Sequence, residues 1–318
     1  MSKKRIISNP IDLAQVCKES KTVNFQEEIL LLGSSKRNFA SWLPKSVQTI
    51  KGIVFIAHGL LEHALAYSVL AEKLVEEGFA VYAIDHVGHG LSDGKRGIIP
   101  DYQLIYKDFV SFVEVVRKRH STKLPTFLFC HSMGGLVGVM SVNKLENITA
   151  VIFSSIGLIS GPGSASPFGI RFLYPLSQTH SAGFLTQLMA SFDPESPTTP
   201  IFLDEVTSSS EELDEMARDP RRTDPFISNK SVAECLKFIQ AAKAEIPHIT
   251  LPFLCIHGSK DVLTYKEGSE FLYSKSSTPI DKKQFKIIEG AKHECIHERE
   301  PIKSNTIDLI VNYFKKYL

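Results

Sequence analysis

The sequence predicts an α/β fold, with a mostly parallel sheet that helices cover on both faces. Strand-like and helix-like segments alternate over most of the 318 residues, which is the pattern of that fold class. Several strand-like segments, such as Ile50–Ala57 (IKGIVFIA), are almost continuously apolar, as expected of strands buried on both faces. The alternation breaks between residues 156 and 226, where Pro, Gly and Ser are frequent. We interpret that stretch as an insertion that caps the working end of the sheet.

The predicted elements lie on either side of that stretch. The expected strands are an antiparallel lead-in of Val23–Leu32 and Lys36–Leu43, followed by Ile50–Ala57, Phe79–Ile84, Thr126–Cys130, Ala150–Ser154, Phe253–Ile256 and Phe285–Ile288. The expected helices are Ala64–Glu77 with a C-cap at Gly78, Tyr102–Arg119, Met133–Asn143, Ser231–Lys243, Tyr265–Tyr273 and one that begins at Ile302. The sequence therefore predicts a core domain made of residues 1–155 and 227–318, and a cap domain of residues 156–226.

The composition argues against several classes of protein and partner. Lys plus Arg number 36 and Asp plus Glu number 35, so no overall field draws nucleic acid or anionic lipid to the chain. The five cysteines are widely spaced and form no C-x-x-C pair, which fits reduced thiols in a cytosolic protein. No apolar run approaches the roughly 20 residues of a transmembrane helix. We expect a cytoplasmic protein whose basic residues 3–5 begin a terminal tail, not a signal peptide.

The clearest sign of chemistry is the segment TFLFCHSMGGLVG. An apolar strand runs into Ser132, and Gly134 and Gly135 follow before a helix. A serine at such a sharp strand-to-helix turn presents its hydroxyl above the sheet, and the helix N-terminus favours negative charge there. The motif G-x-S-x-G has Cys130 in place of its first glycine. Because cysteine is small, we expect this departure to be tolerated.

A second strand ends in His58–Gly59 within VFIAHGLLEH. The backbone N–H groups of Leu60 and Met133 would then form an oxyanion hole beside Ser132. Losing one such donor costs about 3–4 kcal/mol of transition-state stabilisation. We expect the side chain of His58 to be a buried hydrogen-bonding group.

Two further strands end in loops that carry Asp261 (LPFLCIHGSKDVLT) and His293 (FKIIEGAKHECIHE). The order Ser, Asp, His, with each residue just beyond a strand, is that of an α/β-hydrolase triad. Ser132 would be the nucleophile, His293 the general base and Asp261 the acid that orients it. Water would then hydrolyse the acyl-enzyme. This chemistry needs no metal or organic cofactor, and the histidines show no metal-ligand spacing.

Together these motifs resemble the monoacylglycerol lipase and lysophospholipase-like branch of the α/β-hydrolases. The resemblance runs from HGLLEH (58–63) to the C-terminus and includes DHVGHGLSDG (85–94), FLFCHSMGG, Asp224–Phe226, PFLCIHGSKD and EGAKHE. It implies the α/β-hydrolase fold with a mostly parallel eight-stranded sheet. It also implies hydrolysis of a monoacyl ester, a small-molecule lipid, under a mobile apolar cap that can touch a membrane.

The resemblance is weaker at the site for the substrate's head group. Glu62 matches the glutamate that helps to bind glycerol in the animal enzymes. Ala66 replaces an expected arginine, Arg221 replaces a tyrosine, and Thr264 replaces a cysteine. His297 lies one position from the family's second histidine. Glu62, Arg221 and His297 are therefore our candidates for substrate binding, while glycerol recognition stays open.

The apolar clusters of the cap predict either an acyl-chain tunnel or simple packing of the cap onto the core. They comprise Phe168, Ile170, Phe172, Leu173 and Leu176, then Phe184, Leu185, Leu188 and Met189. Monoacylglycerol is the leading substrate. Lysophospholipid is an alternative because Arg221 and Arg222 could bind phosphate, although a solvated charge pair is the simpler and preferred explanation of them. A broad carboxylesterase or thioesterase, a peptidase and a non-catalytic ligand-binding scaffold are further alternatives.

Overall fold

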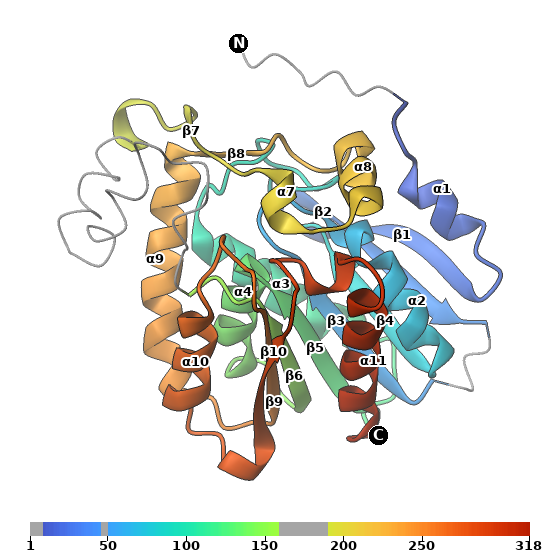
Figure 1. The fold of residues 1–318 in the computed structure, drawn as a ribbon. Helices are drawn as coiled ribbons and strands as arrows, with labels where there is room; N and C mark the ends of the chain where they lie inside the picture. Colours follow the sequence, from blue (N-terminus) through green and yellow to red (C-terminus); the bar gives the residue numbers. More distant parts are fainter. Residues whose placement is uncertain (1–8, 46–49, 159–189) are drawn as a thin grey trace.

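The computed structural model describes residues 9–45, 50–158 and 190–318, and its centre is an eight-stranded sheet (Figure 1). The strand order is β1-β2-β4-β3-β5-β6-β9-β10. The strands are β1 (Val23–Leu32), β2 (Ser35–Pro44), β3 (Gly52–Ala57), β4 (Phe79–Ile84), β5 (Thr126–His131), β6 (Ile148–Ser154), β9 (Phe253–Gly258) and β10 (Lys283–Ile288). The pairs β1–β2 and β2–β4 are antiparallel and the others are parallel. The predicted fold class is thereby confirmed.

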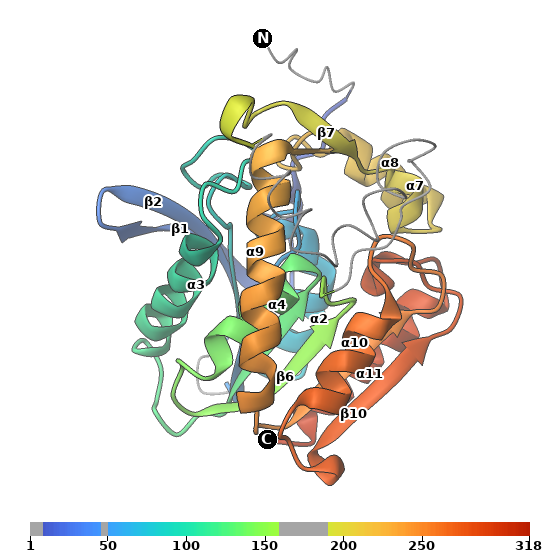
Figure 2. The same cartoon turned by 90° about the vertical axis from the view of Figure 1, so that its left-hand side faces the viewer.

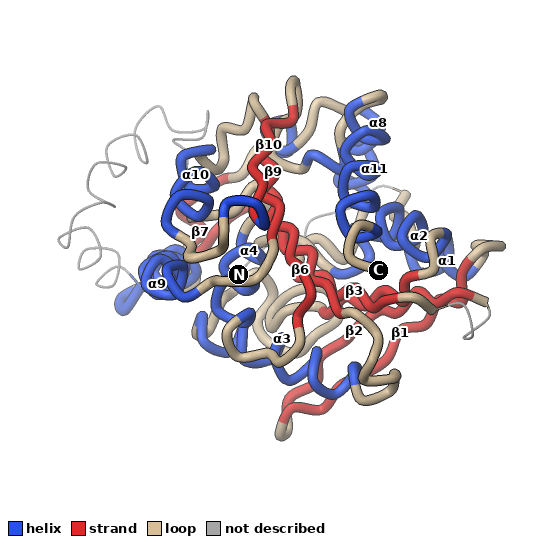
Figure 3. Tube along the Cα trace, turned by 90° about the horizontal axis from the view of Figure 1, so that it is seen from below, coloured by secondary structure: helices blue, strands red, loops and turns tan. Residues whose placement is uncertain are grey.

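Helices cover both faces of this sheet, as Figures 2 and 3 show. One face is covered by α1 (Leu13–Lys18), α2 (Ser68–Glu76) and α11 (Ile302–Lys315), and the other by α3 (Tyr102–Arg117), α4 (Met133–Val142), α9 (Asn229–Glu245) and α10 (Lys266–Lys275). Each face has its own apolar core. All residues of β3, β4 and β5 are buried, which explains why their sequences show no alternation.

The helix predicted at Ala64–Glu77 consists of two parts. A 3-10 turn, η2 (Ala64–Tyr67), precedes α2. Gly78 has a φ of +95° and its N–H donates to the Val75 carbonyl at 2.9 Å, so the predicted glycine cap is present. The 3-10 turn matters for the site because it directly follows the segment HGLLEH and ends with Tyr67.

The described part of the inserted stretch is more regular than its composition suggests. It contains β7 (Pro197–Pro200), which pairs with β8 (Phe226–Ser228), and the helices α7 (Leu203–Val206) and α8 (Ser210–Arg218). Figure 1 shows α7 and α8 close to the loop that precedes α11. The Ser209 side chain accepts a hydrogen bond from Glu212 N–H at 3.3 Å, which is half of a capping box. That S-x-x-E spacing could have identified α8 in the acidic stretch.

The division into core and cap domains stays a prediction. Both apolar clusters of the cap, from Phe168 to Met189, lie outside the described residues, as do basic residues 3–5. Among the residues that are described, no helix combines the length and the apolarity that a membrane crossing requires. The five cysteines are unpaired thiols, and all except the half-buried Cys235 are buried.

Candidate active site

Ser132 occupies a sharp turn between β5 and α4. Its φ is +53° and its ψ is −116°, an unusual conformation for a residue with a side chain, which costs about 1–3 kcal/mol. Three backbone hydrogen bonds hold the turn: Ser132 N–H donates to the Ser154 carbonyl at 2.9 Å, and the Ser132 carbonyl accepts from Gly135 and Gly157 at 2.9 and 3.1 Å. The strain is retained because these bonds and the two flanking elements fix the backbone.

Two glycines of α4 make this turn possible. A Cβ atom at Gly134 would collide with the carbonyl oxygen of Ala57, at the end of β3. A Cβ at Gly138 would lie 2.7 Å from Cys130 Sγ, so the cysteine that replaces the motif's first glycine fits because Gly138 leaves room for it. Helix α4 therefore packs directly against the ends of β3 and β5.

The structure brings the three residues predicted for catalysis together. His293 Nε2 lies 2.9 Å from Ser132 Oγ, and His293 Nδ1 lies 2.8 Å from Asp261 Oδ2. The three residues follow β5, β9 and β10, whose carboxyl ends lie at one edge of the parallel sheet. The arrangement can pass a proton from a serine hydroxyl to an imidazole that a carboxylate orients.

Asp261 is held by several donors besides His293. Its Oδ1 accepts from the N–H groups of Leu263 and Thr264 at 2.9 and 3.0 Å, and its Oδ2 accepts from Thr264 Oγ1 at 2.8 Å. His257 Nε2 lies 3.2 Å from the same oxygen. Burial alone would raise the pKa of Asp261, but His293 and His257 lower it well below its usual value. The carboxyl group is therefore ionised at neutral pH.

The pKa of His293 is raised above its ordinary value. Burial by itself lowers this pKa, but Asp261 outweighs the burial, and Glu294 and Glu62 act in the same direction as Asp261. The imidazole is therefore a stronger base than a free histidine.

The turn after β3 lies beside Ser132, as the packing of Gly134 against Ala57 and the His58 carbonyl indicates. Leu60 is in this turn, and Met133 is the first residue of α4. The N–H of a first helical residue has no acceptor within its helix. Glu62 closes the turn because its Oε2 accepts from Gly59 N–H at 2.8 Å. Leu61 has a φ of +66°, so this turn, like that at Ser132, has a strained residue.

The three candidates for head-group binding occupy different positions. Glu62 is 4% exposed and also accepts from Tyr67 Oη at 2.5 Å. His297 Nε2 lies 2.7 Å from the Ala66 carbonyl, and its Nδ1 lies 2.7 Å from Glu294 Oε2. Arg221 instead forms an ion pair with Glu27 on β1, at 2.5 Å. The arginine that pairs with a carboxylate beside Glu62 is Arg222, whose guanidinium donates to both oxygens of Glu294 at 3.2–3.3 Å.

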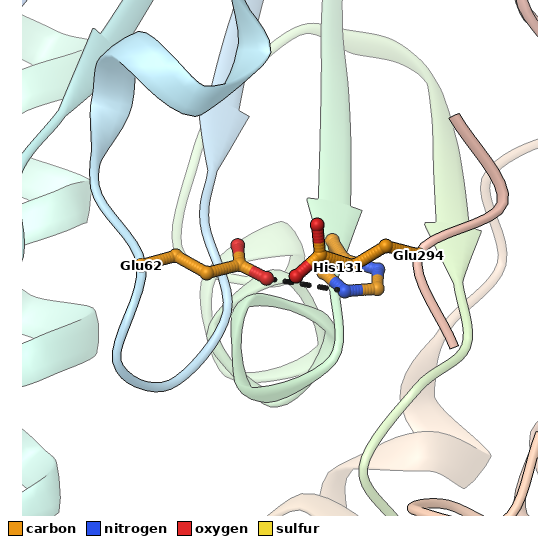
Figure 4. A group of neighbouring side chains, drawn as sticks. All are labelled: Glu62, His131 and Glu294. Atoms are coloured by element: carbon orange, nitrogen blue, oxygen red, sulfur yellow. Dashed lines mark ion pairs between the residues drawn. The ribbon is translucent and has the colours of Figure 1, made fainter. Parts of the chain in front are cut away.

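Glu62, His131 and Glu294 form a buried group whose ligand atoms lie within 4.8 Å of one another (Figure 4). Carboxylate and imidazole atoms at such distances can hold a cation. Here Arg222 already donates to both oxygens of Glu294, and Glu62 Oε2 accepts two hydrogen bonds. The positive charge beside these carboxyl groups is therefore supplied by a guanidinium.

The sequence did not single out His131 and Glu294, although both adjoin residues that it did. Each is next to a predicted catalytic residue in the chain, and the rings of His131 and His293 are 4.8 Å apart. The sequence could have indicated them because polar residues at those positions lie beside predicted catalytic residues, in segments that were expected to converge.

The sheet is mostly parallel, and a strained serine lies between β5 and α4. This serine is hydrogen-bonded to a histidine that a buried aspartate orients. Together these features define a hydrolase of the α/β-hydrolase fold. The family model described as serine aminopeptidase, S33, matches residues 48–300. The chain belongs to that family.

Two curated relatives resemble most of the chain. Monoglyceride lipase from Rattus norvegicus is 29% identical over 84% of this chain and 82% of its own length. Monoacylglycerol lipase from Mycolicibacterium smegmatis is 27% identical over 79% of this chain and 84% of its own length. The expected resemblance to monoacylglycerol lipases is confirmed, and with it the predicted enzyme class of carboxylic ester hydrolases.

A solved structure shows the same fold. A soluble variant of monoglyceride lipase from Saccharomyces cerevisiae, in complex with a substrate analogue, superposes with a TM-score of 0.76 at 19% identity. The match covers 94% of this chain and 97% of that one.

Proposed function

We propose that this hydrolase cleaves monoacylglycerols into fatty acid and glycerol through an acyl-enzyme on Ser132. The observation that carries the proposal is the hydrogen-bonded series Ser132 Oγ, His293 Nε2, His293 Nδ1 and Asp261 Oδ2, with separations of 2.9 and 2.8 Å. The names of the relatives support the substrate, since they are monoglyceride and monoacylglycerol lipases.

In this mechanism Ser132 Oγ attacks the ester carbonyl while His293 Nε2 takes its proton. Asp261 keeps the proton on Nδ1 and stabilises the imidazolium. The N–H groups of Leu60 and Met133 stabilise the oxyanion of the tetrahedral intermediate. His293 then protonates the departing glycerol oxygen, and water, activated by the same histidine, hydrolyses the acyl-enzyme.

Glu62 and His297 are the proposed residues for the head group because both lie close to the loop that carries His293. The lysophospholipase alternative rests on Arg221 and Arg222. Both guanidiniums already pair with carboxylates, Glu27 and Glu294, so a phosphate would have to displace them. This observation favours the neutral glycerol ester.

Peripheral membrane contact is part of the same proposal. Phe192 is 83% exposed, and Phe202 and Phe226 are also exposed. All three lie in or beside the inserted stretch, where large apolar side chains could enter the bilayer interface. Sedimentation with phosphatidylcholine vesicles tests this idea. Binding that Phe192→Ser weakens would support it, and equal pelleting of the two proteins would contradict it.

The catalytic proposal is tested by comparing the wild type with Ser132→Ala on monooleoylglycerol, lysophosphatidylcholine, p-nitrophenyl butyrate and an aminoacyl amide. Removing the nucleophile should lower the rate about a million-fold. Ser141→Ala is the matched control, since Ser141 is a buried serine on the adjacent helix α4 and should leave the rate unchanged.

The substrate that is turned over fastest decides between the alternatives. Faster hydrolysis of the phospholipid or of the amide would replace the glycerol ester as substrate. A folded wild type that turns over none of the four, and that a fluorophosphonate does not label at Ser132, would favour a non-catalytic scaffold.

A further inference from the structure

The neighbours of the proposed catalytic residues form a buried charged cluster, which comprises Glu62, His131, Arg222 and Glu294 (Figure 4 shows all but Arg222). Glu62, His131 and Glu294 are each no more than 4% exposed, and the side chain of Arg222 is 9% exposed. Charged groups are rarely so buried unless they are paired. The two carboxyl groups act on the pKa of His293, but the mechanism above gives no role to Arg222, so its place in the cluster needs its own explanation.

On one side, the cluster determines the shape of the turn that carries Leu60. Glu62 Oε2 accepts from Gly59 N–H and from Tyr67 Oη. A carboxyl group that bonds the backbone within its own turn holds that turn in one conformation. The position of the Leu60 N–H, and hence of an oxyanion donor, therefore depends on where the carboxyl group of Glu62 lies.

On the other side, the cluster reaches the loop of the proposed general base. Glu294 follows His293 in the chain, and both of its oxygens accept from Arg222. The backbone around Arg222 is itself anchored. Arg96 donates to the carbonyl groups of Pro220, Arg221 and Arg222, and Thr223 N–H donates to the Leu61 carbonyl at 3.3 Å.

Arg222 balances the negative charge of the cluster. Without this cation, the ionised carboxylate of Glu294 would be an uncompensated charge beside Glu62 in a poorly hydrated place, where charges interact strongly. Burial and the Glu294 carboxylate already raise the pKa of Glu62 to about 8, while Arg222 acts in the opposite direction. At neutral pH, a protonated Glu62, an ionised Glu294 and Arg222 give the cluster no net charge.

We propose that Arg222 is a positioning residue, whose guanidinium ties the oxyanion turn to the loop of the general base and cancels the charge of Glu294 beside His293. This inference rests on the proposed function. It assigns to Arg222 a role in the rate of catalysis and not in recognition of the head group.

The proposal predicts the kinetics of Arg222→Met, which keeps the length of the side chain and removes its charge. The uncompensated carboxylate of Glu294 should shift, together with the loop of His293, and kcat should fall about ten-fold to a hundred-fold, since small misplacements of catalytic groups are costly. The loss should be the same for monooleoylglycerol and for p-nitrophenyl butyrate, with little change in KM, because p-nitrophenyl butyrate lacks glycerol.

The pH profile gives a second, independent readout. The variant's cluster has lost one positive charge, so the uncompensated carboxylate of Glu294 stabilises the imidazolium of His293. The acid limb of kcat/KM should therefore move to higher pH by about one unit. The charged or titratable groups around the cluster are Glu62, Tyr67, His131, Glu212, Asp219, Asp261, His293, Glu294 and His297, and the substitution leaves all of them in place.

The decisive comparison is with the double variant R222M/E294Q, which removes both charges. Its acid limb should return to the wild-type position and its kcat should recover in part. Arg218→Met is the matched control, because within the described residues its side chain forms an exposed ion pair with Asp214, which is worth little. It should leave both readouts unchanged.

Three outcomes would overturn the proposal. The first is an active R222M variant with the wild-type acid limb. The second is a variant in which only KM for one head group rises, which would make Arg222 a substrate contact. The third is that circular dichroism shows neither R222M nor R222M/E294Q to be folded. Arg222 would then act in packing and not through the charge of Glu294. Hydrolysis and fluorophosphonate labelling by the wild type test the proposed function separately.

Discussion

Two groups of buried histidines lie near the carboxyl ends of the strands and differ in their ionisation. His58, His86 and His89 pack against one another, with ring centroids 4.2 and 5.4 Å apart, and all are fully buried. Burial lowers their pKa values, to about 3 for His86 and about 4 for His89. His293 and His297 are nearly as buried, at 6% exposed, and their pKa values are raised.

The difference depends on where the nearest carboxylate points. Asp261 and Glu294 face the Nδ1 atoms of His293 and His297 at 2.8 and 2.7 Å. Asp85 lies beside the first group, but its oxygens accept from the N–H groups of Ala64 and Leu91 and from Asn38 Nδ2. At His293 and His297 the attraction of the facing carboxylate outweighs the cost of burial. The orientation of the Asp261 carboxylate toward the ring, and not the extent of burial, makes His293 a base.

Removing the carboxylate from His293 should have the largest effect. Asp261→Asn leaves a group of the same shape that cannot stabilise the imidazolium, so kcat should fall about 10⁴-fold. Initial rates on monooleoylglycerol measure this loss. Asp308→Asn, an exposed aspartate on α11, is the control. A loss of less than ten-fold in Asp261→Asn would contradict the role of Asp261.

The wild-type pH profile sharpens the comparison further. His293 must be neutral to take the proton of Ser132, so activity should be lost as the pH falls through its raised pKa. Below that point kcat/KM should decrease about ten-fold per pH unit. An acid limb with its midpoint below pH 6 would show that burial outweighs Asp261.

The smallest effect should come from the other group and should concern stability. His86 is neutral in the folded state and has an ordinary pKa near 6.5 when unfolded. Between about pH 6.5 and 4 the unfolded state therefore binds more protons, and the free energy of unfolding decreases as the pH falls, by roughly 1.4 kcal/mol per unit for each such group.

His86→Leu should flatten this slope. Neither ring nitrogen of His86 makes a hydrogen bond of good geometry within the described part of the chain, so leucine loses little hydrogen bonding. Urea unfolding at pH 6.5 and 5.0 measures the difference, and His248→Asn, at an exposed position, is the control. Equal slopes for wild type and His86→Leu would contradict the lowered pKa.

The sequence predicted best those features that depend on short segments. The strands β3, β4 and β5 were evident because full burial requires a continuous apolar run. Ser132, Asp261 and His293 were found because each follows such a strand. Helix α8 was missed because acidic residues hid its capping box, and the 3-10 turn at Ala64–Tyr67 was missed because its spacing also fits an α-helix.

What the sequence determined by itself was the fold, the family and the order of the three side chains predicted for catalysis, since each of these depends on local patterns along the chain. Only the tertiary structure decided which arginine lies beside Glu62. Arg221 and Arg222 are consecutive, but one pairs with Glu27 on β1 and the other with Glu294. Pairing of charges between loops depends on how distant segments of the chain pack together. The distances between such segments cannot be read from a single sequence.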